Sequence, residues 1–261
     1  MKNVSMLSLL WVGLIPLNTD ATECRVASGP QTVPLIELYT SEGCSSCPPA
    51  DQWLSSLLRA PAVGQYSSLA WHIDYWDSLG WKDRFAQPQF AARQRALAAA
   101  ASARVVYTPQ VFISGRDFRG WSSPNQVQAL LAKINSLPAQ AELQLSMQRV
   151  SAQALQLTVS IRPLVQSPLV YYVALKENNL ESQVSAGENR NAALHHDAVV
   201  RQWLGPFRLM PKGVTTAQHK INLQRDWKTS DLSVVVWVQR QENAEVIQSL
   251  SAAICDGAGD D

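Results

Sequence analysis

The sequence predicts an α/β domain followed by an antiparallel β-sandwich-like domain, an α+β architecture overall. Two observations carry this prediction. From Pro34 to about Leu137, short apolar runs alternate with stretches of helical spacing, which is typical of an α/β layer with a largely parallel sheet. After Pro138, apolar and polar residues alternate at every second position, which favours antiparallel strands in a sandwich or partial barrel. We therefore expect a first domain over residues 32–137 and a β-rich domain over residues 139–255.

Each expected element of the first domain has a local signal. Strands are predicted at residues 35–39, 69–75 and 110–113, and helices at residues 48–59, 90–103 and 124–134. Pro48 and Pro49 in the first turn of one helix are tolerable, because the amides there have no intrahelical partner. Ser123 and Gln126 form a capping box at the start of the third helix.

Strand signals recur along the second domain, with one exception. They lie near residues 143–147, 155–161, 169–175, 216–223, 233–238 and 246–251. The segment from Ser185 to Leu209 is the exception, because it is long and begins with polar residues. The other segments, with turns between them, favour the antiparallel sandwich.

The N-terminus has the features of a secretory signal peptide over residues 1–21. Lys2 supplies the positive charge, the stretch from Met6 to Leu17 is an apolar core too short to span a bilayer, and cleavage is expected after Ala21. The mature protein would then be periplasmic or secreted, with no stable membrane span. The alternative is an uncleaved N-terminal anchor, but a stop-transfer pattern is missing.

The composition fits folded domains and argues against two kinds of partner. Hydrophobic residues make up 46% of the chain, which is enough for sizeable cores. The 22 Lys and Arg residues nearly balance the 21 Asp and Glu residues. Nothing in this balance indicates a basic surface for nucleic acid or for an anionic membrane.

The main chemical signal is the Cys-X-X-Cys motif of Cys44 and Cys47, which follows a predicted strand and opens a predicted helix. Two thiols at this spacing can form a disulfide and exchange it with other thiols without a cofactor. A helix N-terminus favours a thiolate, so we expect Cys44 to be the exposed nucleophile and Cys47 to resolve the mixed disulfide. Structural zinc is the alternative, but it needs a second pair of closely spaced ligands, which the sequence lacks.

The two other cysteines of the mature chain, Cys24 and Cys255, lie near its two ends. Domain termini often lie close together, and an oxidising compartment favours a structural pair beside a reactive pair. We therefore expect a structural disulfide between Cys24 and Cys255. Two separate free thiols are the alternative.

The order of elements from about Thr32 to Leu137 resembles the thioredoxin fold, with Thr108-Pro109 directly before a strand. This resemblance implies that Pro109 is a cis-proline facing the disulfide and that Thr108 contacts the substrate. An ordinary trans proline at the start of a strand is the alternative.

Glu37 lies within an apolar predicted strand, seven residues before Cys44. The resemblance to thioredoxin implies that this carboxylate assists proton transfer to the second cysteine, because burial would raise its pKa towards neutrality. A paired or edge-exposed Glu37 is the alternative.

Nearly all of the mature chain is also similar to a narrower family, the exported bacterial thioredoxin-like proteins catalogued as a domain of unknown function. The matching segments are Glu37–Asp51, His72–Asp77, Gly80–Asp83, Tyr107–Gln110, Gly187–Arg190 and His196–Arg201. Ala198 departs from the asparagine expected at its position. The resemblance implies a fold and leaves the substrate open.

The aromatic block from Trp71 to Trp81 has two interpretations. Trp76 and Trp81 either pack a loop or form a recognition wall beside Cys44, where exposed aromatic side chains would anchor a polypeptide. We retain both tryptophans as candidate substrate-binding residues.

A histidine-rich segment also has two interpretations. Glu188, His195 and His196 could bind a metal, but neighbouring residues of an extended strand point to opposite faces. We expect no metal there. The preferred interpretation is a hydrogen-bond network between the domains, formed by Glu188, Asn189, Arg190, His196 and Arg201.

Together these residues favour a periplasmic or secreted thiol–disulfide oxidoreductase that exchanges the Cys44–Cys47 disulfide with thiols or disulfides of exported proteins. Two alternatives are non-enzymatic: a binding protein whose two thiolates hold Cu(I), and a scaffold with a permanent disulfide. The sequence has only 4 Met residues and no Met/His cluster, which weighs against copper. It indicates neither the direction of electron flow nor the oligomeric state.

Overall fold

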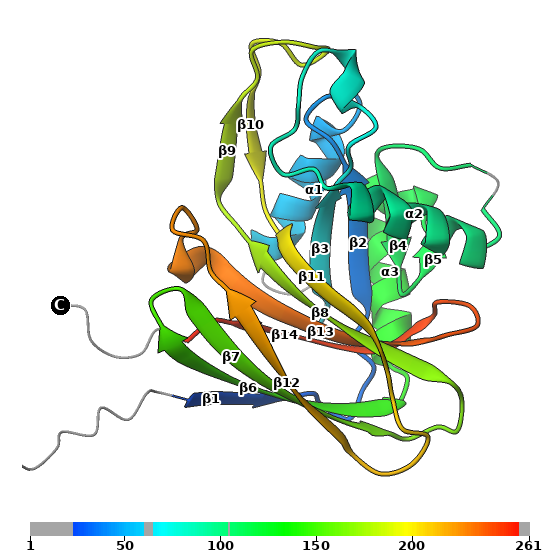
Figure 1. The fold of residues 1–261 in the computed structure, drawn as a ribbon. Coiled ribbons are helices and arrows are strands. Elements are labelled where there is room, and N and C mark those ends of the chain that lie inside the picture. The colour runs from blue at the N-terminus through cyan, green and yellow to red at the C-terminus, as the bar shows by residue number, and fades with distance from the viewer. Residues whose placement is uncertain (1–22, 60–64, 104, 256–261) are drawn as a thin grey trace, which may run out of the picture.

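The computed structural model describes residues 23–59, 65–103 and 105–255, so the predicted signal peptide lies outside the described residues. Strands predominate in this part of the chain. They form an eight-stranded sheet, a four-stranded sheet and a two-stranded sheet (Figure 1). In Figure 1 the four-stranded sheet lies beneath the large sheet, and the three α-helices of the described residues lie beside the upper part of the large sheet.

The large sheet takes strands from both halves of the chain, in the order β14-β13-β8-β11-β3-β2-β4-β5. The first half supplies β2 (Leu35–Thr40), β3 (Ser67–His72), β4 (Gln110–Ile113) and β5 (Arg116–Asp117). The second half supplies β8 (Leu169–Glu177), β11 (Val199–Arg208), β13 (Leu232–Arg240) and β14 (Val246–Ala253). Strands β2 and β3 run parallel, joined by a helical crossover, whereas β4 runs antiparallel to β2.

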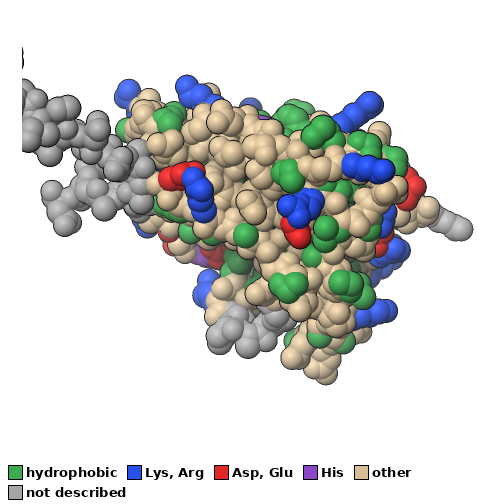
Figure 2. All heavy atoms as spheres, turned by 90° about the horizontal axis from the view of Figure 1, so that it is seen from below, with side chains coloured by type: hydrophobic (Ala, Val, Ile, Leu, Met, Phe, Trp, Pro, Cys, Tyr) green, Lys and Arg blue, Asp and Glu red, His purple; other side chains and the backbone are tan. Residues whose placement is uncertain are grey.

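The four-stranded sheet is antiparallel and packs on one end of the large sheet. Its strands are β1 (Glu23–Ala27), β6 (Ala141–Ser151), β7 (Ala154–Pro163) and β12 (Thr215–Asn222). Burial alternates along β6, and its inward side chains share a core with those of β8 and β13. Seen from below, where this sheet lies in Figure 1, basic and acidic side chains are interspersed on the surface (Figure 2).

The helices cover the other end of the large sheet on both faces. They are α1 (Pro48–Arg59), α2 (Pro88–Ala100) and α3 (Pro124–Asn135). Successive residues of β2 face opposite sides, so Ile36 and Leu38 pack in the core beneath α1 and α3. Leu35 and Tyr39 lie in the core beneath α2 instead. This alternation decides which side chains of β2 share a core with α1, the helix that follows the cysteines.

The predicted fold class, an α/β thioredoxin-like domain followed by an antiparallel β-sandwich-like domain, is wrong. Strand β11 from the second half pairs with β3 from the first, so a single mixed sheet runs through both halves. The sheet is also not largely parallel, because only β2–β3 and the short β11–β3 contact are parallel among its described pairs. An isolated α/β unit would leave β3 as an unpaired edge, and β11 satisfies that edge. The domain boundaries at residues 32–137 and 139–255 stay predictions.

Individual elements agree better with the sequence. Helix α1 and strand β4 have the predicted bounds, whereas β3 ends at His72 and leaves Tyr75 exposed. Ser123 makes no side-chain cap hydrogen bond, so the predicted capping box is not formed. The segment from Ser185 to Leu209, which lacked a strand signal, contains β11 and also β10 (Ala193–His196), which pairs with β9 (Leu180–Gln183).

Candidate functional site

The Cys-X-X-Cys motif lies in the loop between β2 and α1 and is closed as a disulfide. The Cα atoms of Cys44 and Cys47 are 5.4 Å apart. The amide of Cys47 donates to the carbonyl of Cys44 at 3.1 Å, and the carbonyl of Cys47 accepts from Ala50 at 2.9 Å. The motif therefore stands at the N-terminus of α1, where the helix dipole favours a thiolate.

Both cysteine side chains are fully buried, which corrects the expectation of an exposed Cys44. Only Ser45 and Ser46 between them are exposed. The Ser46 hydroxyl lies 3.3 Å from Cys44 Sγ and donates to the carbonyl of Thr108 at 3.4 Å. The disulfide is thus covered by side chains of neighbouring loops rather than open to solvent.

Three of the four predicted substrate-binding residues lie beside Cys44. The Thr108 hydroxyl donates to Cys44 Sγ at 3.4 Å, and the indole of Trp76 donates to the same hydroxyl at 2.8 Å. The Thr108–Pro109 peptide bond is cis, as predicted. The three side chains are partly exposed, so they form the part of the disulfide's surroundings that a partner would meet.

Trp81, the fourth predicted substrate-binding residue, reaches the motif only through Glu42. Its indole donates to Glu42 Oε2 at 2.7 Å. A Cβ on Gly187 would lie 3.2 Å from Trp81 Cβ, and Gly187 has a φ of +72°. Trp81 therefore supports the loop before Cys44 and packs against the segment of the second half that contains Gly187.

Side chains of that segment bind backbone atoms of the cysteine loop. The side-chain amide of Asn189 donates to the carbonyls of Glu42 and Cys44, at 2.9 and 3.0 Å. The carboxylate of Glu188 accepts from the Ser45 amide at 3.0 Å. Glu188 and Asn189, two residues of the predicted network between the halves, thus bind the cysteine loop itself.

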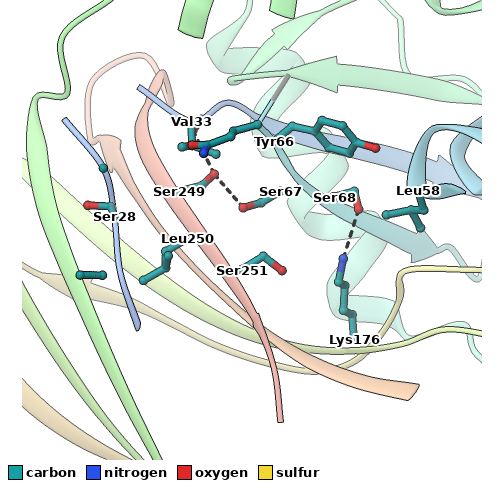
Figure 3. A pocket seen from close by; sticks show the side chains of 13 residues that line it. Ser28, Val33, Leu58, Tyr66, Ser67, Ser68, Lys176, Ser249, Leu250 and Ser251 are labelled. Carbon is teal, nitrogen blue, oxygen red and sulfur yellow. Dashed lines mark hydrogen bonds between the residues drawn. The ribbon is translucent and has the colours of Figure 1, made fainter. Parts of the chain in front are cut away.

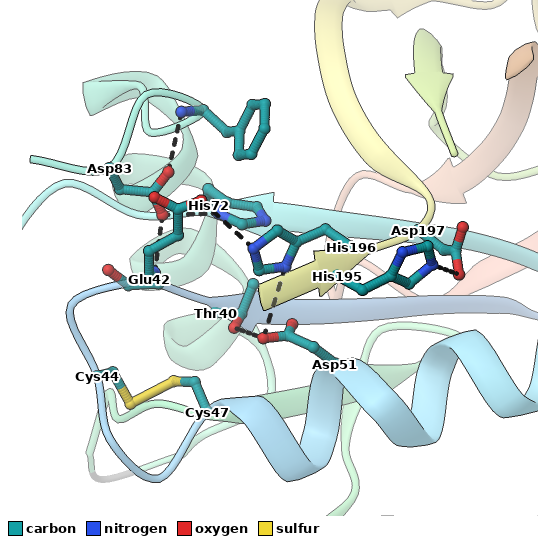
Figure 4. Close-up of polar contacts among 12 residues, drawn as sticks. Thr40, Glu42, Cys44, Cys47, Asp51, His72, Asp83, His195, His196 and Asp197 are labelled. Atoms are coloured by element: carbon teal, nitrogen blue, oxygen red, sulfur yellow. Dashed lines mark hydrogen bonds and ion pairs between the residues drawn. A yellow bond between two sulfur atoms is a disulfide. The ribbon is translucent and has the colours of Figure 1, made fainter. Parts of the chain in front are cut away.

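A buried polar cluster lies on the inner side of the motif, between α1, β3 and β10 (Figure 4). His72 Nδ1 lies 2.6 Å from Asp83 Oδ2, which also accepts from the Glu42 amide at 2.9 Å. His196 Nε2 lies 3.4 Å from Glu42 Oε1, and its Nδ1 lies 3.8 Å from Asp51 Oδ2. All five side chains are buried. The cluster brings together two imidazoles and three carboxylates behind the disulfide.

Asp51 is the member of this cluster closest to the cysteines in sequence. It lies one helical turn after Cys47, whose carbonyl accepts its amide at 3.2 Å, and it accepts from the Thr40 hydroxyl at 3.1 Å. Burial raises the pKa of Asp51 from its ordinary value of 3.8 to about 7, although His196 and Thr40 act to lower it. A carboxyl group that titrates near neutrality can hold or release a proton at that pH.

Glu37, the predicted proton-transfer residue, does not belong to this cluster. Its carboxylate accepts from Arg93 Nε at 2.8 Å and from Arg93 Nη2 at 2.6 Å. Its neighbours on the same side of β2, Leu35 and Tyr39, lie in the core beneath α2, whereas α1 packs on the opposite face. Burial raises the pKa of Glu37, but its partner is an arginine that stays charged.

Sequence analysis assigned no role to Asp51, Thr40 or Asp83. The signal for Asp51 was present, because a carboxylate four residues after Cys47 falls within the apolar stripe of the helix. His196 was expected in a network and is found in the cluster, whereas Arg201 pairs instead with Glu177 at 3.3 Å.

The structural disulfide predicted between Cys24 and Cys255 is present, and its Cα atoms are 6.3 Å apart. It ties β1 to the chain just after β14. In the described ranges, no three His, Cys, Asp or Glu side chains are arranged to hold a metal ion. None of the described helices combines the length and apolarity needed to cross a membrane.

Comparison with known proteins gives a family and a fold. The model of a family described as protein of unknown function (DUF1223) matches residues 35–239. The X-ray crystal structure of protein AGR_C_4864 from Agrobacterium tumefaciens is 20% identical, with a TM-score of 0.64, and the match covers 90% of this chain and 99% of that one. This likeness shows that another solved protein shares the fold. A search of curated proteins gave no match.

Two further solved structures match smaller parts of the chain. A domain of the outer membrane lipoprotein Omp28 from Porphyromonas gingivalis is 13% identical with a TM-score of 0.34, covering 44% of this chain and 88% of that one. A calcium-binding mutant of Bacteroides uniformis beta-glucuronidase 2 is 9% identical with a TM-score of 0.26, covering 41% of this chain and 12% of that one. Likenesses this distant carry no argument about the chain.

Proposed function

The chain belongs to this DUF1223 family, and we propose that it is an exported thiol–disulfide exchange protein. In this proposal the Cys44–Cys47 pair exchanges its disulfide with thiols of other exported proteins. The family membership itself carries no activity, so the proposal rests on the site.

The observation that carries the proposal is the pairing of a helix-capping disulfide with a buried carboxyl that titrates near neutrality. Reduction of a disulfide produces two thiolates that need protons at neutral pH. Asp51, with a pKa raised by burial to about 7, is protonated in a useful fraction of molecules at that pH.

The proposed exchange has two steps. A partner thiolate attacks Cys44 Sγ, the Cys44–Cys47 bond breaks, and a mixed disulfide forms while Cys47 leaves as a thiolate. Cys47 takes a proton from the buried cluster that contains Asp51. A second partner thiolate then attacks the partner's sulfur in the mixed disulfide, so Cys44 leaves as a thiolate stabilised by the helix N-terminus. The partner becomes a disulfide and the pair becomes a dithiol; the reverse sequence oxidises the pair.

Access to Cys44 requires its cover to open. Two hydroxyl groups, those of Ser46 and Thr108, lie over the sulfur at 3.3 and 3.4 Å. Exposed apolar side chains lie close by in the sequence, Tyr75 next to Trp76 and Val106 two residues before Thr108. Exposed apolar residues of this kind suit a polypeptide partner better than a small thiol.

Two disulfides in one chain support export, because disulfides persist in oxidising compartments and are rare in the cytosol. This agrees with the signal peptide predicted from residues 1–21.

The test is the redox equilibrium of the purified mature protein against glutathione, with Cys44→Ser as the control variant. Reversible exchange at a potential between about −120 and −270 mV supports the proposal and gives the direction of electron flow. The variant Asp51→Asn is expected to change the pH dependence of that equilibrium around pH 7. The control variant Asp226→Asn, which makes the same replacement at an exposed aspartate, is expected to leave that dependence unchanged.

The second candidate is a permanent structural disulfide, favoured by the complete burial of both cysteines and by the grip of Asn189 on the loop. It predicts that the pair stays oxidised in glutathione buffers, with a potential below about −300 mV. That result would remove the exchange proposal.

A further inference from the structure

A cavity of about 650 Å³ lies away from the cysteines, between the end of α1 and the strands β3, β8 and β14 (Figure 3). The chain just after β1 closes another side of it. Its volume lies within the range of small-molecule sites in proteins. None of the residues of the disulfide site lines it.

The walls of this cavity are hydroxyl-rich. Five serines line it, four of them on β3 and β14 and the fifth just after β1, together with the partly exposed Tyr66. The lining serines are Ser28, Ser67, Ser68, Ser249 and Ser251. Ser249 and Ser67 bond to each other at 2.8 Å, and the Ser249 hydroxyl also bonds to the carbonyl of Val33 at 2.9 Å, so this pair is occupied within the fold.

Lys176 is the unusual member of the lining. Its side chain is 5% exposed and extends from β8 to Ser68, where its amine donates to the hydroxyl at 3.2 Å (Figure 3). Asp197 attracts it only at longer range, since among the described residues no carboxylate lies within ion-pair distance of its amine. An ammonium group has three donors, so two of the three donors of Lys176 have no protein acceptor in the described structure.

Burial of a cation with one neutral partner is costly unless another group compensates it. Burial indeed lowers the pKa of Lys176 to about 8, so the amine is still charged at neutral pH. An anion next to it would supply the missing acceptors. Ser68, whose oxygen accepts from Lys176, still has its own proton to donate to the same anion.

We propose that this cavity binds a small hydroxylated anion, whose carboxylate or phosphate group contacts Lys176 and Ser68 and whose body lies against the serine-lined walls. The charged group is an oxyanion, because an ammonium and a hydroxyl donor are the groups that recognise carboxylate and phosphate. The body is polar, because Ser28 and Ser251 line the wall beside it, and Leu58 and Leu250 supply the apolar part.

The experiment is calorimetric titration of the full mature chain with four probes: D-gluconate, D-glucose 6-phosphate, inorganic phosphate and neutral D-glucose. We expect binding of gluconate, of glucose 6-phosphate or of both, and no binding of glucose. Preference between the first two identifies carboxylate or phosphate as the source of the charge. Inorganic phosphate, which lacks the body, is expected to bind more weakly than the better of them.

The variant Lys176→Met, similar in length and without charge, is expected to weaken binding by at least about 30-fold, the loss typical of removing one partner of a buried charged contact. Lys212→Met, at an exposed lysine outside the cavity, is the matched control and should bind as the unmodified protein does. Ser68→Ala, a smaller change at the same point, is expected to weaken binding and serves if the Met variant does not fold.

Three outcomes would overturn the proposal. They are the absence of binding by every anionic probe, equal binding by the Lys176 and Lys212 variants, and binding of glucose as tight as that of gluconate. Because the cavity and the disulfide site share no residue, none of these outcomes bears on the exchange of Cys44–Cys47.

Discussion

Replacement of Asp51 by asparagine tests whether a near-neutral carboxyl group lies behind the disulfide. The side chain is buried, and burial raises its pKa from 3.8 to about 7. Asparagine has nearly the same shape and can still accept from the Thr40 hydroxyl, but it cannot ionise. The variant therefore removes the titration and keeps most of the packing.

The sign and size of the effect follow from linkage. Between pH 4 and 7 the unfolded chain has lost the proton of Asp51 while the folded chain still holds it, so the folded state binds more protons and stability falls as pH rises. The interval from 3.8 to about 7, at 1.36 kcal/mol per pH unit, amounts to about 4 kcal/mol. Asp51→Asn is thus expected to gain about 4 kcal/mol of stability relative to the unmodified protein between pH 4 and pH 8.

Urea unfolding of both proteins with disulfides intact, at steps between pH 4 and 8, measures this difference. Contributions of titrating groups outside the buried cluster cancel to first order when the two curves are subtracted. Asp226→Asn, at a side chain that is 73% exposed, is the matched control and should give a flat difference. A flat difference for Asp51→Asn as well would mean that Asp51 ionises normally, and the proposed proton source for Cys47 would be wrong.

Three further changes test the fold and the cavity. Lys176→Met should be more stable than the unmodified protein by about 3 kcal/mol at pH 7, and urea unfolding should show that gain vanishing between pH 8 and 10.5, where the unfolded chain holds the lysine proton longer than the folded one. Gly115→Ala should lose at least about 2 kcal/mol, because φ is +82° and the new Cβ would collide with the backbone of Ala244; an unchanged melting temperature contradicts this. Cys24→Ser should lose about 5 kcal/mol in urea unfolding, because its disulfide with Cys255 closes a loop with a sequence separation of 231; a loss below about 1 kcal/mol would show an unfolded chain that is already compact.

Local patterns were enough to predict the elements around the cysteines. Helix α1 has the predicted bounds because proline at its start, an apolar stripe and Arg59 in its last turn are all signals within one short segment. The cis bond before Pro109 was expected from the resemblance to thioredoxin. The disulfide between Cys24 and Cys255 was expected because both cysteines lie near the ends of the mature chain and an oxidising compartment favours their pairing.

The prediction of the fold class was wrong because it depends on β11, whose alternation of apolar and polar residues is irregular. Register shifts between Val200 and Gln202 and between Leu204 and Phe207 break the two-residue period, and Pro206 argues against a central strand. The pairing of β11 with β3 also joins residues far apart in sequence, Val199 and Ala70. No local signal reports a pairing of that kind, so the two halves were predicted as separate domains.

The position of Glu37, on the face of β2 away from α1, could not be predicted for a related reason. All six residues of β2 are buried, so the sequence does not show which face of the strand meets α1. Glu37 falls on the face of α2, and Thr40, three residues later, falls on the face of α1 and contacts Asp51. The helix pattern was better evidence for a functional carboxylate than the strand pattern. Burial of a carboxylate in the apolar stripe of a helix costs free energy, so its presence there indicates a role.

The contacts around Cys44 are of two kinds: some hold the cysteine loop in its conformation, and others are weak enough to break. Asn189 and Glu188 bind backbone atoms of the cysteine loop, and they come from the second half of the chain. Two hydroxyl groups contact the sulfur at 3.3 and 3.4 Å, and the one that donates to it, that of Thr108, makes a weak hydrogen bond because sulfur is a poor acceptor. An arriving partner can therefore displace the hydroxyls of Ser46 and Thr108 while the loop keeps its conformation. In the proposed exchange, the second half of the chain therefore holds the cysteine loop in place while the hydroxyl contacts open.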